Sequence, residues 1–167
     1  MEQIIIGLGS NLGDSKRICR EAVEALRRHP RIEVEKVSSL FLTEPVGMVD
    51  QDWFINGVAL CKSSLEPLDF LEVTAGIEHA FGRVRLVRWG PRSLDLDILC
   101  YGERIIDLPP RLEIPHPRMH ERSFVLLPLM EIAPHWAHPV LGKTAQELWA
   151  ELSAGPGATD ARVLEES

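Results

Sequence analysis

The order of hydrophobic patterns along the first hundred residues restricts the fold more than any other feature of this sequence. Four segments have the apolar or β-branched composition of strands: 3–8, 32–42, 53–61 and 94–101. Two segments have the 3.6-residue period of amphipathic helices: 15–29 and 65–81. The resulting order, strand–helix–strand–strand–helix–strand, predicts an α+β two-layer sandwich, with helices packed on one face of a mainly antiparallel sheet.

Local signals define the ends of these elements. Asp14 is expected to cap the first helix, and Pro30 to end it. Ser64 is expected to cap the second helix, with Pro67 in its first turn. The sequence GLGSNLGD at 7–14 fits a dinucleotide-binding fingerprint poorly, so we interpret it as a strand-to-helix turn.

The rest of the chain predicts smaller elements. They are a short strand at 104–107, a rigid proline-rich loop at 109–117, and helices at 123–132 and 144–152. We expect residues 1–153 to form a single domain. Residues 154–167 contain glycine, proline and acids with little to bury, which predicts a flexible C-terminal tail.

Composition excludes several classes of protein. With 167 residues, 45% of them apolar, the chain can form a core without disulfides. A net charge of −7 argues against a nucleic-acid-binding protein, and no apolar run approaches the roughly 18 residues of a membrane span. We expect Cys19, Cys61 and Cys100 to be buried free thiols, which favours a cytoplasmic location.

The central segment 83–122 differs from the acidic chain around it. All eight of its basic residues are arginines, set against six acidic residues. A guanidinium group presents a planar fork of donors that suits phosphate or carboxylate oxygens. The segment is therefore either a binding site for a polyanion or a solvated arginine-rich face, and the count alone does not decide between them.

Two aspartates lie on one side of the strand predicted at 94–101. Asp95 and Asp97 alternate with aliphatic residues, so the two-residue period directs both carboxylates away from the core. Aspartate is uncommon in strands. The pair could simply face solvent on an edge strand, but neighbouring carboxylates repel each other unless a cation lies between them. Mg²⁺ prefers such oxygen ligands, so we interpret the two residues as magnesium ligands.

Four arginines precede these aspartates without an intervening acid: Arg83, Arg85, Arg88 and Arg92. Phosphoryl transfer requires metal ions that bridge phosphate oxygens and cationic side chains that stabilise the developing charge. The sequence has no G-x-x-x-x-G-K-[ST] motif, which excludes a P-loop enzyme. The segment therefore predicts phosphoryl-transfer chemistry on a different scaffold.

From Ile4 to about His138 the sequence resembles the 6-hydroxymethyl-7,8-dihydropterin pyrophosphokinase family. The most specific motif is RWGPRSLDLDIL at 88–99, and GLGSNLGD, TEPVG, FIN and IPHPRMHERSF follow the family order. The resemblance implies a ferredoxin-like fold. It also implies transfer of the diphosphoryl group of ATP to the hydroxymethyl oxygen of the pterin, with release of AMP, in folate biosynthesis.

For the nucleotide, the resemblance implies that Asp95 and Asp97 hold two Mg²⁺ ions against the phosphates of ATP, which is the co-substrate. Arg83 and Arg92 would steady the transferred group, and with Asp97 they make up the expected catalytic set. The expected ATP-binding residues are Arg85, Arg88, Ile98 through its backbone, Arg111, His116 and Arg122.

For the pterin, the resemblance implies a flat pocket whose expected residues are Thr43, Val46, Phe54, Asn56, Trp89 and Phe124. Phe54 and Phe124 would sandwich the ring, and stacking of this kind contributes about 1–3 kcal/mol per base. The side-chain amide of Asn56 offers the donor and the acceptor that a pyrimidinone edge needs. Without the resemblance, the two phenylalanines would be ordinary core residues and Asn56 a turn or strand-end residue.

Two other functions stay open at this point. One is another Mg²⁺-dependent, nucleotide-using transferase on the same scaffold, such as a nucleotidyltransferase. The other is a non-catalytic ferredoxin-like binding module, which for RNA would need aromatic residues on central strands and a basic open face. The predicted strand presents aspartates instead, so we expect a monomeric enzyme with ATP and a pterin as small-molecule substrates.

Overall fold

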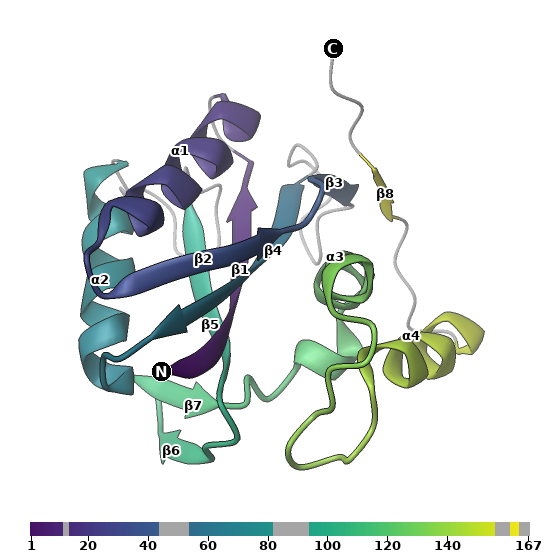
Figure 1. The fold of residues 1–167 in the computed structure, drawn as a ribbon. Helices are drawn as coiled ribbons and strands as arrows, with labels where there is room; N and C mark the ends of the chain where they lie inside the picture. The colour runs from purple at the N-terminus through teal and green to yellow at the C-terminus, as the bar shows by residue number, and fades with distance from the viewer. Residues whose placement is uncertain (12–13, 44–53, 82–93, 156–160, 164–167) are drawn as a thin grey trace.

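A computed structural model describes residues 1–11, 14–43, 54–81, 94–155 and 161–163 (Figure 1). Within these residues the main sheet has six strands: β1 (Glu2–Ser10), β2 (Ile32–Val37), β3 (Phe41–Thr43), β4 (Phe54–Ser63), β5 (Asp95–Tyr101) and β8 (Ala161–Val163). The strand order is β5-β1-β4-β3-β8, with β2 also paired to β4, and every pair is antiparallel. The predicted α+β fold with an antiparallel sheet is confirmed.

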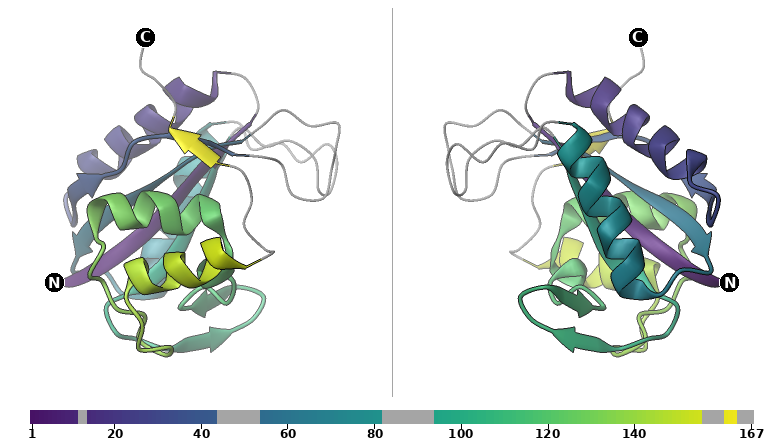
Figure 2. Two further views of the ribbon diagram at one scale, coloured as in Figure 1. Left: turned by 90° about the vertical axis from the view of Figure 1, so that its right-hand side faces the viewer. Right: turned by 90° about the vertical axis from the view of Figure 1, so that its left-hand side faces the viewer.

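The helices lie on both sides of this sheet. They are α1 (Ser15–Arg28), α2 (Pro67–Ala80), the short 3₁₀ helix η1 (Met119–Glu121), α3 (Ser123–Ile132) and α4 (Ala145–Ala154). The two opposed views of Figure 2 show α2 in front of the sheet from one side, and α3 and α4 in front of it from the other. All four α-helices are predicted from the sequence, with helices on one face of the sheet only. In the structure α3 and α4 cover part of the opposite face.

Two apolar clusters correspond to these two sides. The first joins even-numbered residues of β1 and β5, such as Ile6 and Leu96, to α1 and α2. The second joins Ile5 of β1 and Val58 of β4 to α3, where Leu129 is fully buried. We call the sheet surface under α1 and α2 the first face, and the surface partly covered by α3 the second face.

The helix ends follow from local hydrogen bonds, with one correction. Asp14 caps α1 as predicted, and its Oδ1 accepts from the backbone N–H of Arg17 at 3.3 Å. Ser64 does not cap α2. Pro67 occupies the first helical position, which makes Glu66 the cap residue, and the Ser64 hydroxyl instead accepts from Nε of Arg31 at 3.2 Å.

The strand predicted at 32–42 is two strands, and the break between them has a clear cause. The Oγ of Ser38 accepts from the backbone N–H of Val58 at 2.9 Å and donates to the carbonyl of Ser39 at 2.8 Å. Oε1 of Glu131 on α3 accepts from the Ser39 amide at 2.5 Å. Side chains therefore take the backbone partners that a continuous ladder would use.

Two further segments differ from the predictions. The proline-rich stretch contains a hairpin, β6 (Ile106–Leu108) and β7 (Leu112–Ile114), so it is not only a loop. The C-terminal stretch includes β8, which pairs with β3 and which the sequence does not predict. In the described part of the chain, no helix combines the length and apolarity needed to cross a bilayer.

The three cysteines are free and buried, as predicted. Burial raises the pKa of the Cys19, Cys61 and Cys100 thiols to about 12 in each case. A thiol with such a pKa carries almost no thiolate at neutral pH, so these residues act as small apolar core residues.

Candidate active site

The candidate site lies on the second face of the sheet, where β5 and β1 run side by side. Asp95 pairs with Gly9 and Asp97 with Gly7, while Leu96 between them is buried in the first cluster. The predicted alternation is confirmed, since both aspartates occupy the face opposite the aliphatic residues. Asp95 is half-buried and Asp97 is exposed. About 7 Å separates the Cβ atoms of residues two apart on a strand, so both carboxylates can reach one ligand.

Two glycines of β1, Gly7 and Gly9, leave the sheet surface beside these aspartates without side chains. We call this part of the second face, formed by β5, β1 and β4, the floor of the site. Gly7 lies within β1, as in the strand predicted at 3–8, and β1 continues through Gly9 to Ser10, so the strand-to-helix turn begins later than predicted. On the other side of Gly9, β4 places Asn56 directly opposite. A Cβ built on Gly9 would lie 3.0 Å from Oδ1 of Asn56 and 4.0 Å from Cβ of Asp95. Glycine therefore keeps open the space between an amide and a carboxylate.

Gly9→Ala tests this space. The new methyl group would push the Asn56 amide by a few tenths of an ångström, so we expect kcat/KM for the pterin to fall about 10-fold, as misplaced binding groups do. Stability should change little, because the atom displaced is the end of a side chain. The matched control is Gly76→Ala at an exposed position of α2, where nothing lies within 4 Å of the new Cβ. This variant should stabilise the protein by about 0.5–1 kcal/mol without changing kinetics. Equal kcat/KM in both variants would contradict the prediction.

The residues after β7 bring positive charge to the aspartates. Burial lowers the pKa of the Arg122 guanidinium below its ordinary value, Asp97 opposes this shift, and Arg118 adds to it. The mutual effect places Arg122 within electrostatic range of Asp97. Cζ of Arg122 also lies 5.4 Å from the ring centroid of Phe124, a cation–π distance. Arg122 remains charged because a guanidinium group is not deprotonated in proteins.

His116, two residues after β7, lies against β5 in the same region. Its backbone N–H donates to the carbonyl of Leu99 at 2.8 Å, and its Nδ1 accepts from the backbone N–H of Arg118 at 3.2 Å. Burial, followed by the positive charges of Arg122 and Arg118, lowers the pKa of the imidazole to about 4. At neutral pH the ring is therefore uncharged, and its proton is on Nε2, which can donate to an anion.

This pKa predicts a pH dependence of stability. Between about pH 6.5 and about pH 4 the unfolded chain binds a proton at His116 that the folded chain does not, so the free energy of unfolding should fall as the pH falls through this range. His116→Asn keeps an acceptor near the Arg118 amide and removes the titration. Urea unfolding at pH 7.5 and pH 5 should show a smaller loss for the variant than for the natural protein. Equal losses would contradict the assignment.

The described pterin candidates come from β3, β4 and the start of α3. Phe54 begins β4 and is half-buried, and Asn56, two residues on, is only 8% exposed. Thr43 pairs with Phe54 across β3 and β4. Phe124, at the start of α3, is half-buried against the second cluster. The sheet register therefore brings Asn56, Gly9 and Asp95 side by side, from three different strands.

Other predicted residues lie elsewhere or outside the described residues. The Ile98 side chain is buried on the first face, which leaves its backbone for any contact with a nucleotide. Nη2 of Arg111, in the β6–β7 hairpin, lies 3.9 Å from Oε1 of Glu72 on α2. Six candidates are outside the described residues: Val46, Arg83, Arg85, Arg88, Trp89 and Arg92.

The structure adds one polar group that the sequence does not predict as part of the site. Glu78 of α2 is buried, and its Oε2 accepts from the backbone N–H of Leu96 at 2.9 Å. Leu96 is the residue between the two aspartates. A signal was present, since an acidic residue stands in the inward-facing row of a helix, but its partner could not be known before the helix and strand were placed.

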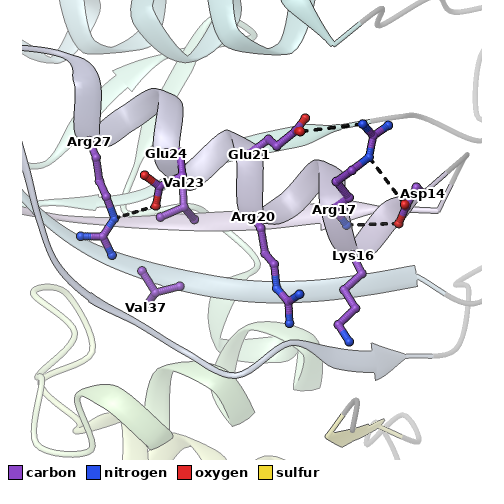
Figure 3. Close-up of a pocket in the computed structure, with 9 residues that line it drawn as sticks. All are labelled: Asp14, Lys16, Arg17, Arg20, Glu21, Val23, Glu24, Arg27 and Val37. Carbon is purple, nitrogen blue, oxygen red and sulfur yellow. Dashed lines mark hydrogen bonds and ion pairs between the residues drawn. The ribbon is translucent and has the colours of Figure 1, made fainter. Parts of the chain in front are cut away.

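A separate hollow of about 530 Å³ lies between α1 and β2, on the side of the first face (Figure 3). Val23 and Val37 form its apolar part. Its charged lining is partly neutralised by pairs within α1 and its cap, such as Arg27 with Glu24 at 3.3 Å and Arg17 with Asp14 at 3.5 Å. The aspartates of β5 lie on the opposite face, so this hollow is not part of the candidate site.

Comparisons with known proteins identify the family of this chain. The family model of 7,8-dihydro-6-hydroxymethylpterin-pyrophosphokinase matches residues 5–134. A Bacillus subtilis protein named 2-amino-4-hydroxy-6-hydroxymethyldihydropteridine pyrophosphokinase is 50% identical over 127 residues, which are 76% of this chain and 75% of that protein. Proteins of the same name from Pseudomonas aeruginosa and Methylorubrum extorquens are 46% identical (80% of this chain, 82% of that one) and 44% identical (91% and 94%).

Solved structures support the fold. A Plasmodium falciparum HPPK-DHPS crystal structure superposes with a TM-score of 0.69 at 16% identity, and covers 92% of this chain. A second one, described as wild type with pteroate, gives 0.73 at 17% identity. This chain spans 44% and 42% of those longer chains. With a family model over most of its length and relatives at 44–50% identity, the chain belongs to the 7,8-dihydro-6-hydroxymethylpterin-pyrophosphokinase family, the ATP-dependent diphosphotransferases of folate biosynthesis.

Proposed function

We propose that this chain transfers the diphosphoryl group of ATP to the hydroxymethyl oxygen of 6-hydroxymethyl-7,8-dihydropterin and releases AMP. One observation carries the proposal beyond family membership: a single glycine, Gly9, separates a carboxylate group from a buried side-chain amide on the same sheet face. A metal–phosphate compartment beside Asp95 and a heterocycle compartment beside Asn56 would then be direct neighbours, as a transfer between the two substrates requires.

The donor set at β5 fits Mg²⁺. Two carboxylates lie on one face, and in the described part of the chain no group of three or more histidine, cysteine or acidic side chains forms a closed metal cage. Mg²⁺ is commonly held by one or two carboxylates, with water and substrate phosphates completing its shell. We propose that Asp95 and Asp97 hold two such ions, which when bound would neutralise charge on the phosphate oxygens.

Cationic and neutral donors would bind the triphosphate from the side of η1. Arg122 contributes a fixed positive charge near Asp97, and His116 contributes a neutral Nε2–H donor. Arg111 and the Ile98 backbone are further candidates for the nucleotide. We also propose roles for four arginines on the basis of sequence: Arg83 and Arg92 at the transferred group, Arg85 and Arg88 at the nucleotide.

The pterin would occupy the β4 side of the floor. The Asn56 amide can pair with a pyrimidinone edge, which presents alternating donors and acceptors. Phe54 and Phe124 offer aromatic faces for stacking. Thr43, Val46 and Trp89 complete the proposed pterin-binding set on the basis of sequence.

In the proposed reaction the hydroxymethyl oxygen attacks the β-phosphorus of ATP. The new bond joins that oxygen to Pβ, the bond between Pβ and the bridging oxygen of the α-phosphate breaks, and AMP leaves with the electron pair. Asp97 is our candidate to accept the hydroxyl proton. The protein forms no covalent bond with either substrate in this reaction. Positioning of the two substrates and neutralisation of charge therefore supply most of the acceleration.

The deciding experiment follows labelled ATP. Purified protein is incubated with ATP, MgCl₂ and 6-hydroxymethyl-7,8-dihydropterin, and AMP and the pterin diphosphate are measured. Equal amounts of both support the proposal. Release of pyrophosphate would indicate nucleotidyl transfer, and pterin-independent or absent turnover would favour a non-catalytic module. We further propose that the enzyme works in the cytoplasm as a monomer on these small molecules, which a sedimentation measurement can check for the monomer.

A further inference from the structure

Glu78 is an unusual residue of the described chain, because it is the one acidic side chain found there that is buried, at 7% exposure. It lies on the inner side of α2, among residues that contact the first cluster. Burial of a carboxylate in such a position lowers the stability of the fold unless hydrogen bonds compensate for the lost hydration. Its Oε2 accepts from the backbone N–H of Leu96 at 2.9 Å. The charge is thus directed at the backbone of β5.

Leu96 is the link between the two proposed metal ligands. In an antiparallel pair only alternate residues direct their backbone groups at the partner strand. The amide of Leu96 is directed at α2, while Asp95 and Asp97 on either side lie opposite Gly9 and Gly7. The strand is consequently held from both sides, by β1 and by Glu78. The pleat at Leu96 sets the direction in which both neighbouring aspartates project.

From this geometry we infer that Glu78 is a positioning residue for Asp95 and Asp97, which acts by fixing the backbone of Leu96. The inference rests on the proposed function, since it assumes that the two carboxylates bind metal. Groups that orient metal ligands without touching the metal commonly change metal affinity or activity when they are altered. A residue that only stabilised the packing of α2 would not affect the metal dependence.

Three variants and a control separate these roles. Glu78→Gln keeps an acceptor oxygen at the same distance along the side chain. Glu78→Leu removes the acceptor, and Glu78→Asp keeps the charge but shortens the side chain by one methylene, which provides the test if the leucine variant does not fold. Thr74→Val is the matched control: Thr74 is also buried on α2, but its hydroxyl donates to the Leu71 carbonyl within the helix.

Two measurements are made on each folded variant. Amide hydrogen exchange of Leu96 in metal-free protein should accelerate in the leucine and aspartate variants, but not in Glu78→Gln or Thr74→Val. The Mg²⁺ concentration that gives half-maximal AMP formation should rise about 10-fold or more in the same two variants. The KM for the pterin should change little, because Asn56 is on another strand.

The outcomes distinguish this inference from the proposed function. Unchanged Mg²⁺ dependence in a folded Glu78→Leu or Glu78→Asp protein would overturn the positioning role while AMP formation by the natural protein still supports the function. If the natural protein formed no AMP, the function would fail. Leu96 exchange and Mn²⁺ binding in the presence of ATP, followed by electron paramagnetic resonance, would then decide the positioning role, with wild-type values for both in these variants overturning it.

Discussion

Asp97→Asn is expected to reduce the rate of AMP formation in Mg²⁺ by about 10³-fold, the scale observed when one charge-stabilising group is removed from a reacting site. Asparagine has the shape of aspartate but lacks the negative charge that a divalent cation needs. Asp97 is exposed on the second face, so the fold should tolerate the change. We expect kcat to account for most of the loss, because the pterin edge of the floor is on β4. Steady-state kinetics with both substrates varied would measure it.

Asp107→Asn provides the control for charge alone. Asp107 is also an exposed aspartate on a strand, but it lies in the β6–β7 hairpin opposite Glu113, outside the candidate site. This variant should keep its kcat and its Mg²⁺ dependence. A near-natural rate in Asp97→Asn, or an equal loss in the two variants, would exclude Asp97 as a metal ligand. Asp95→Asn should behave like Asp97→Asn, since the two carboxylates share one face of β5.

Local patterns were sufficient to predict the elements that position this site. The alternation around Asp95 and Asp97 predicts a strand with carboxylates on one face, because the strand period is two residues whatever the tertiary context. The start of α1 follows in the same way from Asp14, whose side chain caps the helix within one turn. Such features depend on neighbours in sequence, so they can be read without the fold.

Features that depend on distant partners could not be predicted from these local patterns. The break between β2 and β3 depends on Ser38, which bonds to β4, and on Glu131, which reaches back from α3. The role of Glu78 depends on Leu96, eighteen positions further along the chain. The proximity of Arg122 to Asp97 likewise depends on the path of the chain through β7 and η1. The resemblance to a family pointed to Arg122, but the electrostatic coupling needed the structure.

The glycines of β1 illustrate a third case. The sequence predicts a strand over 3–8 and a strand-to-helix turn over 7–14, which leaves Gly9 outside the strand. In the structure Gly7 and Gly9 stay in the strand and face the site, where the absence of a side chain is the useful property. A glycine inside a strand can mark a place where a ligand approaches the backbone closely. That interpretation applies to Gly9, which lies between Asn56 and Asp95.

Asn56 should determine whether the pterin binds. Asn56→Ala removes a donor and an acceptor from a nearly buried position, so polar groups of the bound ring would lose their partners without access to water. Sites built to hydrogen-bond a substrate discriminate strongly when a partner is missing. We expect kcat/KM for the pterin to fall by about 10²–10³-fold, which corresponds to roughly 3–4 kcal/mol, while the KM for ATP changes little. Initial-rate measurements at saturating ATP would determine this.

Two further variants show whether the loss is specific. Asn56→Asp keeps the shape and the acceptors but removes the N–H donors, so it should be as impaired as Asn56→Ala if the donor is required. Ser38→Ala removes the buried hydrogen bond that the backbone N–H of Val58 donates to Ser38. Val58 is two residues from Asn56 on β4, so this variant should lower stability without changing the KM for the pterin. If Ser38→Ala raised that KM as much as Asn56→Ala, the effect would be a general loosening of β4. If Asn56→Asp kept the natural kcat/KM, the amide would not be the donor that recognises the ring.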